Sequence, residues 1–307
     1  MGLLKNTFTF DGDGTSKDRL LTALIILLFA YLLSLAAAFL EWGRFLAVAW
    51  AFCIVGMSSL EVARMFARDE ATSRYLPLRG VWLFLLYIAP AGAAMISAVE
   101  WVAHGVLDFT LPYLVTAISA VVLTITHVIL GREDLDGAAR IGSRLAPAFM
   151  LVSVCGTQLI PLAAHQRGIQ MLWWIIGTVA INDAAAYFVG RSLGRSKMAP
   201  AISPNKTIEG SLAGVLVGAA AGIPLWYALV GIPLSVNACG LLVVLSIVGG
   251  QAADLSKSYI KRLCGVKDTG AFFPGHGGVL DRFDGAIGAA PFLLLWLYVC
   301  GVLAART

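Results

Sequence analysis

Charged residues are scarce in this sequence: Asp, Glu, Lys and Arg make up only 13% of its 307 residues. A soluble domain carries roughly 25% charged residues, so the composition excludes an ordinary soluble protein. Apolar residues make up 59% of the chain, and the mean hydropathy is +0.84. A chain this apolar needs lipid as part of its surroundings, and we expect an integral membrane protein.

Other features are missing as well. The five cysteines include no CxxC pair and stand in no His-rich spacing, which argues against a zinc site and a disulfide framework. There is no GxxxxGK[ST] run, so any phosphate must be bound by metal ions and side chains. We find no internal repeat and no low-complexity linker. The first apolar stretch is too long for a cleavable signal peptide.

Long apolar segments are what the sequence has in abundance. A bilayer core of about 30 Å is crossed by a helix of about 20 apolar residues, and no alternating pattern of a β-barrel appears. We therefore predict an all-α polytopic membrane protein with about nine transmembrane helices. The expected spans are Leu20–Leu40, Phe45–Phe66, Val81–Val102, Leu111–Leu130, Leu145–Ala164, Ile169–Val189, Leu212–Val230, Val236–Tyr259 and Ala286–Ala304.

The basic residues favour one orientation. With a cytoplasmic N-terminus, all but three of the 22 Lys and Arg residues fall in cytoplasmic segments. Cytoplasmic loops are enriched in Lys and Arg, so we predict a cytoplasmic N-terminus, an external C-terminus and an odd number of spans. The short loops fit a bacterial inner membrane. Five tryptophans near predicted outer ends suggest an interfacial aromatic belt: Trp42, Trp101, Trp173, Trp174 and Trp226.

Placing an ionisable residue in or beside a membrane span costs free energy, so each such residue is a candidate for a structural or functional role. Glu61 and Arg64 are three residues apart and could form a structural ion pair or belong to a site. The densest group lies between Asp254 and Asp284. On a helix, Asp254, Ser258 and Lys261 share one face, and Asp281 and Asp284 converge on one turn.

These carboxylates stand beside cations and flexible glycines, a combination that suits a divalent metal with polyphosphate. Magnesium takes few protein carboxylates and shares its shell with water and substrate phosphates. The simpler alternative is a solvated loop that caps two helices, with Asp281 favourable at a helix N-terminus. Both alternatives stay open on this chemistry alone.

Two blocks of residues resemble the phosphatidate cytidylyltransferase (CDP-diacylglycerol synthase) family. The stronger block is Ser258, Lys261-Arg262, Lys267-Asp268, Pro274, His276-Gly277-Gly278, Asp281-Arg282 and Asp284. The second is Asp183, Ala186-Tyr187, Gly190-Arg191, Gly194, Ser203-Pro204, Lys206-Thr207 and Glu209-Gly210. The chain departs from the family pattern at Ala253, where Gly is usual, and at Lys257, where an acid is common.

The resemblance implies transfer of CMP from CTP to phosphatidic acid, giving CDP-diacylglycerol and pyrophosphate. It implies that Asp254, Asp281 and Asp284 are catalytic and hold Mg²⁺, in a two-metal site whose second ion could be monovalent, such as K⁺. It implies a substrate-binding set of Asp183, Lys206, Ser258, Lys261, Arg262, Lys267, Asp268, His276 and Arg282. These residues would face the cytoplasm, with CTP, phosphatidic acid and the bilayer as partners and no nucleic acid.

The organisation follows from this placement. We expect an N-terminal transmembrane scaffold over residues 1–170 and a C-terminal catalytic region over 171–307, with cytoplasmic loops at 190–210 and 257–285. Gly214, Gly218 and Gly222 permit close helix packing within one chain or between the copies of a homodimer. A secondary transporter, a CTP-dependent lipid or polyprenol kinase and a catalytically silent scaffold remain as alternatives.

Overall fold

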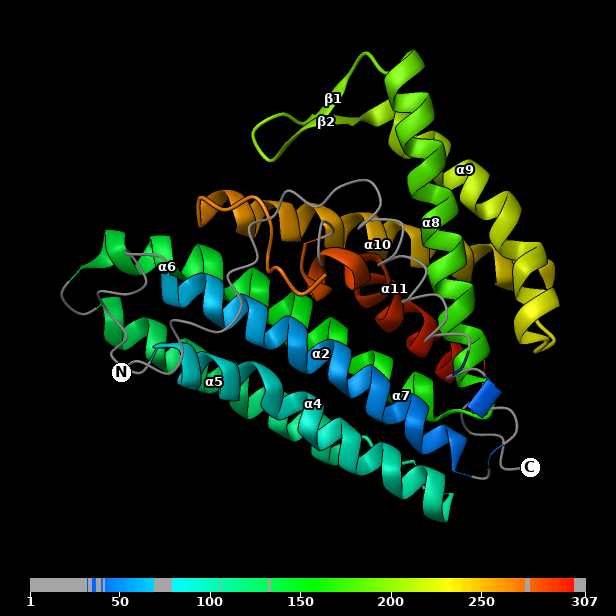
Figure 1. The fold of residues 1–307 in the computed structure, drawn as a ribbon, viewed down its shortest axis with the longest axis horizontal. Helices are drawn as coiled ribbons and strands as arrows, with labels where there is room; N and C mark the ends of the chain where they lie inside the picture. The colour runs from blue at the N-terminus through cyan, green and yellow to red at the C-terminus, as the bar shows by residue number, and fades with distance from the viewer. Residues whose placement is uncertain are drawn as a thin grey trace.

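The computed structural model describes residues 42–68, 79–105, 107–131, 134–273 and 277–300, together with 32, 35, 36 and 40. Helices dominate this part of the chain (Figure 1). Eight of them are long and apolar enough to cross a membrane. The elements are α2 (Gly43–Arg68), α4 (Arg79–His104), α5 (Thr110–Gly131), α6 (Leu135–Ala148), η1 (Phe149–Cys155), η2 (Gly156–Gln158), α7 (Leu159–Ala164), α8 (Gly168–Leu193), β1 (Lys197–Ala199), β2 (Ser203–Thr207), α9 (Ile208–Leu225), η3 (Trp226–Val230), α10 (Val236–Leu263) and α11 (Val279–Val299).

The all-α polytopic fold is confirmed. The eight long helices correspond one to one with the predicted spans from Phe45–Phe66 onward. Most of the predicted first span lies outside the described residues, so the total of nine and the orientation of the termini stay predictions. The large apolar side chains left exposed on α5, such as Ile118, Val121 and Ile125, fit a helix surrounded by lipid.

The fifth predicted span begins earlier than expected. The chain is helical from Leu135 to Ala164, through α6, η1, η2 and α7. Asp134 starts it as N-cap, because its side chain accepts a hydrogen bond from the Gly137 backbone N–H at 2.8 Å. The first turns are amphipathic, and a search for 20 apolar residues therefore missed them.

Two of the tryptophans assigned to an interfacial belt have another role. Trp174 and Trp226 are fully buried, and their rings meet edge to face at 5.1 Å between centroids. Trp174 donates its indole N–H to the carbonyl of Gly222 at 2.8 Å. This correction has a simple cause: hydropathy shows how far along a span a ring lies but not which side of the helix it occupies. Trp42, in contrast, is 55% exposed.

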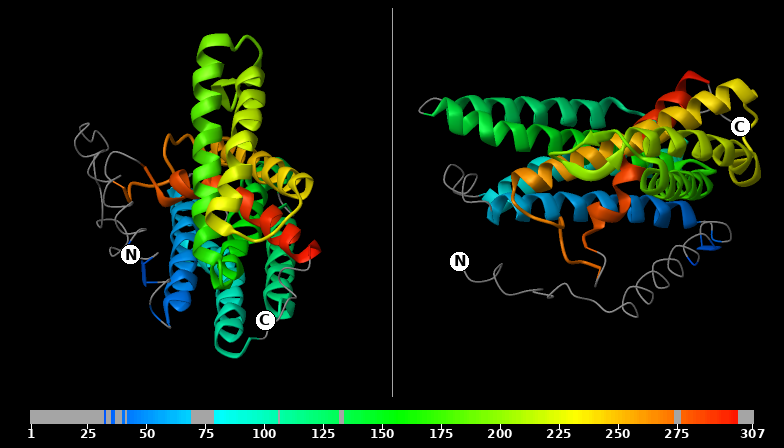
Figure 2. Two further views of the ribbon diagram at one scale, coloured as in Figure 1. Left: turned by 90° about the vertical axis from the view of Figure 1, so that its right-hand side faces the viewer. Right: turned by 90° about the horizontal axis from the view of Figure 1, so that it is seen from above.

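Helices α8 and α9 run side by side in all views (Figure 1, Figure 2). Their contact is lined by glycine on α9. A methyl group at Gly214 would lie 2.6 Å from Oδ1 of Asn182, and one at Gly210 would lie 2.6 Å from the carbonyl of Ala186. The small residues that permit close packing are therefore used within the chain, as one of the two predicted uses required.

Helices α10 and α11 approach even more closely. A methyl group at Gly288 would lie 2.3 Å from the carbonyl of Gly249, and one at Gly249 would lie 2.4 Å from the carbonyl of Gly288. This backbone contact brings the following turn of α10, with Asp254, against the start of α11, with Asp284. Close helix packing thus determines where the ionisable residues meet.

The two predicted loop ranges contain more helix and strand than expected. Within 190–210, α8 continues to Leu193, and β1 and β2 form an antiparallel hairpin that the all-α prediction did not include. Within 257–285, α10 continues to Leu263 and α11 begins at Val279, seven residues before the predicted start at Ala286. Asp281 and Asp284 therefore stand on the first two turns of α11. The predicted start was too late because these charged residues lower the mean hydropathy of the window.

Candidate active site

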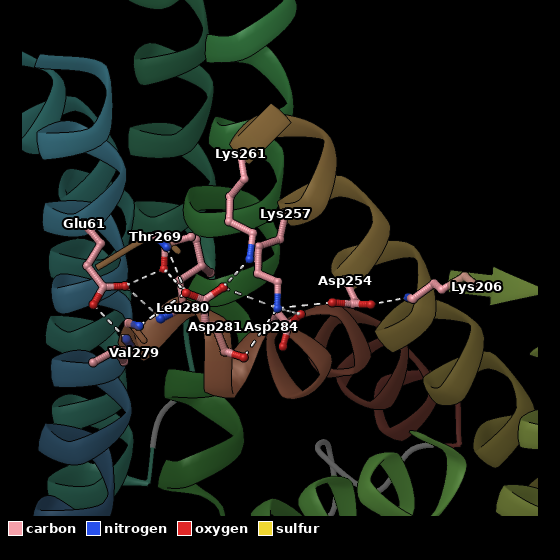
Figure 3. A network of polar contacts seen from close by, with 11 residues as sticks. Glu61, Lys206, Asp254, Lys257, Lys261, Thr269, Val279, Leu280, Asp281 and Asp284 are labelled. Atoms are coloured by element: carbon pink, nitrogen blue, oxygen red, sulfur yellow. Dashed lines mark hydrogen bonds and ion pairs between the residues drawn. The ribbon is translucent and has the colours of Figure 1, made fainter. Parts of the chain in front are cut away.

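The charged residues of the predicted site gather where the end of α10 packs on the start of α11 (Figure 3). Asp254, Lys257 and Lys261 follow one another on α10 in steps of three and four, which places them on one face. Asp281 and Asp284 face them from α11. The structure thus brings together all three aspartates that the sequence singled out.

Lys257 lies at the centre of this cluster. Its Nζ is 2.6 Å from Oδ2 of Asp284, 3.1 Å from Oδ1 of Asp254 and 3.7 Å from Oδ1 of Asp281. It also donates a hydrogen bond to the backbone carbonyl of Asp281 at 3.4 Å. The Lys257 side chain is only 8% exposed. A buried ammonium is tolerated only when it is paired, so the three carboxylates and Lys257 stabilise one another.

Asp281 uses both of its carboxylate oxygens. Oδ1 accepts a hydrogen bond from Nζ of Lys261 at 2.8 Å. Oδ2 accepts from the backbone N–H and the hydroxyl of Thr269, at 2.8 and 2.9 Å, and from the backbone N–H of Gly278 at 3.3 Å. Asp281 therefore fixes the α10–α11 loop to the first turn of α11, where a carboxylate also interacts favourably with the helix dipole.

Glu61 reaches the same place from α2. Its Oε1 accepts a hydrogen bond from the Val279 N–H at 2.7 Å, and its Oε2 accepts from the Leu280 N–H at 3.0 Å. The hydroxyl of Thr269 lies 3.1 Å from Oε2. Glu61 is 6% exposed. Its buried carboxylate thus satisfies the first backbone donors of α11, a use that the proposed pairing with Arg64 did not foresee.

The β1–β2 hairpin contributes the open side of the cluster. Nζ of Lys206, on β2, pairs with Oδ2 of Asp254, and each of these side chains is about one-third exposed. The hairpin is tied to α10 by a hydrogen bond from Nε of Arg262 to the carbonyl of Ile202 at 3.2 Å. Lys206 is therefore the most exposed of the three lysines in the cluster.

Asp183 adds a polar extension on α8. It accepts a hydrogen bond from Nδ2 of Asn182 at 2.9 Å, and Oδ1 of Asn182 accepts one from Gln251 of α10 at 2.8 Å. Asp183 lies close enough to Asp254 and Lys206 to interact electrostatically with both. Asp183, which was predicted to bind substrate, is therefore near the cluster, although its side chain is exposed.

The remaining predicted residues lie around the cluster. Ser258 is half-buried on α10. Four exposed side chains surround the α10–α11 loop or follow it: Arg262, Lys267, Asp268 and Arg282. His276 lies outside the described residues. Their roles in substrate binding stay predictions.

The whole region falls within a recognised family. The model of the Cytidylyltransferase family matches residues 17–300. The chain belongs to this family. Every candidate site residue lies inside the matched range, so this cytidylyltransferase-family chain carries its charged cluster within the part that defines the family.

Individual relatives are also similar to this family member. A protein named phosphatidate cytidylyltransferase from Brucella suis biovar 1 is 44% identical over 129 residues, 42% of this chain and 47% of the relative. One of the same name from Bacillus subtilis is 33% identical over 182 residues, 59% of this chain and 66% of the relative. An uncharacterised Escherichia coli K12 protein, YnbB, is 35% identical over 153 residues, half of each chain. The chain thus spans about half the length of the first relatives it matches.

The donor set of the cluster suits magnesium, which prefers carboxylate oxygens. Asp254 and Asp284 both lie beside Nζ of Lys257, at 3.1 and 2.6 Å, so the two carboxylates are near enough to share one hard cation. Asp281 is already engaged by Lys261, Thr269 and Gly278. Among the described residues, no three His, Cys, Asp or Glu side chains are arranged as a metal site, because Lys257 lies between the aspartates.

Sequence reasoning missed three members of this cluster. Lys257 was noted only as a departure from the family pattern, although its steps of three from Asp254 and four to Lys261 place it on the same helix face. Glu61 was recognised as a charge that is costly to bury, but its contact with the start of α11 was not predicted. Thr269 carried no signal, because a threonine in a loop is ordinary until its neighbours are known.

Proposed function

We propose that this protein transfers a cytidylyl group from CTP to phosphatidic acid, giving CDP-diacylglycerol and pyrophosphate. The observation that carries the proposal is the convergence of Asp254, Asp281 and Asp284 with Lys206, Lys257 and Lys261 at the ends of two membrane-spanning helices. Charges of both signs at such a place suit a nucleoside triphosphate whose acceptor is a lipid. Membership of the cytidylyltransferase family and the names of the relatives support this reaction.

The reaction forms one bond and breaks one bond. A phosphate oxygen of phosphatidic acid attacks the α-phosphorus of CTP, and the bond from that phosphorus to the oxygen bridging the α- and β-phosphates breaks. A phosphate monoester has its second pKa near about 6 and is mostly ionised at neutral pH. The nucleophile therefore needs no strong general base, and the protein has mainly to position two anions and offset their charge.

The cations of the cluster fit that task. Lys206 is the most accessible of the three lysines and can leave Asp254 for a phosphate oxygen, while Lys261 has only Asp281 as an ionic partner among the described residues. Arg262, Lys267, Arg282 and His276 would add charge or hydrogen bonds for the triphosphate and the lipid head group. Magnesium held by Asp254 and Asp284 would supply further positive charge to the reacting phosphates. Asp281 would hold the α10–α11 loop and the ends of both helices together through Lys261, Thr269 and Gly278.

The charge distribution supports a cytoplasmic site in a bacterial inner membrane. Only Arg44, Arg167 and Arg306 fall on the external side of the predicted topology. The site side chains then face the compartment that contains CTP. Phosphatidic acid can keep its acyl chains in the bilayer while its head group meets the nucleotide.

A lipid-transfer assay in detergent tests the reaction. The purified protein is incubated with magnesium, phosphatidic acid and CTP labelled at either the α- or the γ-phosphate. We expect the α-label, but not the γ-label, to enter the lipid, and EDTA to abolish the transfer. Transfer of the γ-label would instead show a kinase, and no transfer by folded protein across several phosphatidic acids would contradict the proposal.

Asp254→Asn is the informative variant, because Asp254 is partly exposed and does not hold the α10–α11 loop. We expect a loss of about 100-fold or more in rate. Asp108→Asn is the matched control: Asp108 binds the backbone N–H of Thr110 at 2.7 Å in the loop before α5, away from the cluster. Equal activity of the two variants would remove Asp254 from the site.

A further inference from the structure

Four oxygen atoms surround the buried ammonium of Lys257. They come from the carboxylates of Asp254, Asp281 and Asp284 and from the carbonyl of Asp281, at 2.6 to 3.7 Å. Lys261, one turn further along α10, contacts a single carboxylate oxygen within the cluster, Oδ1 of Asp281. Lys257 is therefore held as a cation at the centre of an oxygen cage, and Lys261 as a partner at its edge.

Without Lys257, three carboxylates would meet in a buried place. Like charges at such distances repel strongly and cannot all stay ionised unless cations accompany them. One solution is to bind mobile cations from solution; another is to supply one cation on a side chain. An ammonium on the same chain is always present and needs no free ion.

We propose that the Lys257 ammonium is a built-in cation that takes the place of a second metal ion, so that the cluster binds a single divalent ion. The inference rests on the proposed function only in assigning that ion to phosphate transfer. Asp254 pairs with the buried Lys257 through Oδ1 and with the more exposed Lys206 through Oδ2, so a divalent ion held by Asp254 would compete with Lys206. Displaced Lys206 is then free to contact a phosphate.

Two binding measurements test the proposal without CTP or lipid substrate. First, equilibrium dialysis of the detergent-solubilised wild type against Mn²⁺, a probe for hard divalent ions, should give one ion per chain. Second, thermal unfolding is followed while choline chloride is replaced by KCl at constant ionic strength. The wild type should not respond, whereas Lys257→Met should gain about 3 to 6 °C in Tm with KCl, because K⁺ then neutralises the vacated carboxylates.

Lys261→Met is the matched control, since it removes a lysine from the same helix face and the same Asp281 carboxylate. It should show no KCl response beyond that of the wild type. Two Mn²⁺ ions per wild-type chain would overturn the proposal, and this result needs no variant to fold. An equal KCl response of the two variants would overturn it as well. Failure of the lipid-transfer assay leaves both readouts intact, so the two proposals fail separately.

Discussion

Oε1 of Glu61 accepts a hydrogen bond from the backbone N–H of Val279 at 2.7 Å, across 218 positions of sequence. Glu61 stands on α2, and Val279 is the first residue of α11. With the second bond, from Leu280 to Oε2, the carboxylate acts as a cap supplied by another helix. The first two turns of α11, which carry Asp281 and Asp284, are thereby fixed to the N-terminal half of the chain.

Replacing Glu61 by Ala should therefore damage both stability and activity. It leaves two buried backbone donors without a partner, each at a cost of about 1 to 3 kcal/mol. We expect the Tm in detergent to fall by about 5 to 10 °C and the transferase rate to fall because Asp281 shifts. Glu100→Ala is the control, since Glu100 is an exposed carboxylate on α4. Equal Tm values for the two variants would show that the cap contributes nothing.

Much of the fold could be predicted because hydropathy reports burial in lipid directly. The eight described spans were each anticipated, and the errors lie at their ends. Asp281 and Asp284 hid the first two turns of α11, and polar residues hid the start of α6 at Leu135. A window that averages hydropathy treats a charged first turn as loop, so helices that begin with functional charges are systematically shortened.

The site was predictable only in part. Asp254, Asp281 and Asp284 could be selected because charged residues beside apolar runs are rare. The contact between Glu61 and α11 could not be inferred, because nothing in the sequence states which helices are neighbours. The replacement of an expected acid by Lys257 looked like the loss of a functional carboxylate. The position of Lys257 among three other carboxylates appears only when the helices are packed.

Thr269 joins the cap formed by Glu61 to the carboxylate of Asp281, and its hydroxyl has one proton for two acceptors. The hydroxyl lies 2.9 Å from Oδ2 of Asp281 and 3.1 Å from Oε2 of Glu61. Thr269→Val removes it but keeps the backbone bond to Asp281. We expect a loss of about 1 to 3 kcal/mol in stability and a reduced rate. Thr269→Ser should restore both, and a failure to do so would show that the hydroxyl is not the group that matters.

Lys206 should affect binding of CTP more than stability. Its ion pair with Asp254 is about one-third exposed, and such pairs contribute roughly 0 to 1 kcal/mol. Lys206→Met should thus leave the Tm nearly unchanged while raising KM for CTP by about tenfold, if its charge serves the triphosphate. Lys197→Met, on the exposed neighbouring strand β1, is the control for loss of a hairpin charge. An unchanged KM in Lys206→Met would remove this lysine from nucleotide binding.

The approach of α10 to α11 sets the distance between Asp254 and Asp284, and Gly288 controls that approach. A Cβ at this position would lie 2.3 Å from the carbonyl of Gly249 and 2.4 Å from Cβ of Ala253. Both neighbours are on the backbone or directly attached to it, so the helices must separate. A shift of about 1 Å in catalytic groups can cost about 100-fold in rate, and we expect a loss of this order for Gly288→Ala.

Gly92→Ala provides the matched comparison. Gly92 lies within α4, and a Cβ there would meet nothing within 4 Å. This variant should keep full activity and gain slightly in helix stability, since Ala is favoured over Gly within a helix by about 1 kcal/mol. If Gly288→Ala were as active as Gly92→Ala, the charged cluster would tolerate a wider spacing of α10 and α11 than the short contacts around Lys257 indicate. A loss confined to Gly288→Ala would instead show that a backbone contact one turn beyond Asp284 sets the geometry of the charged cluster.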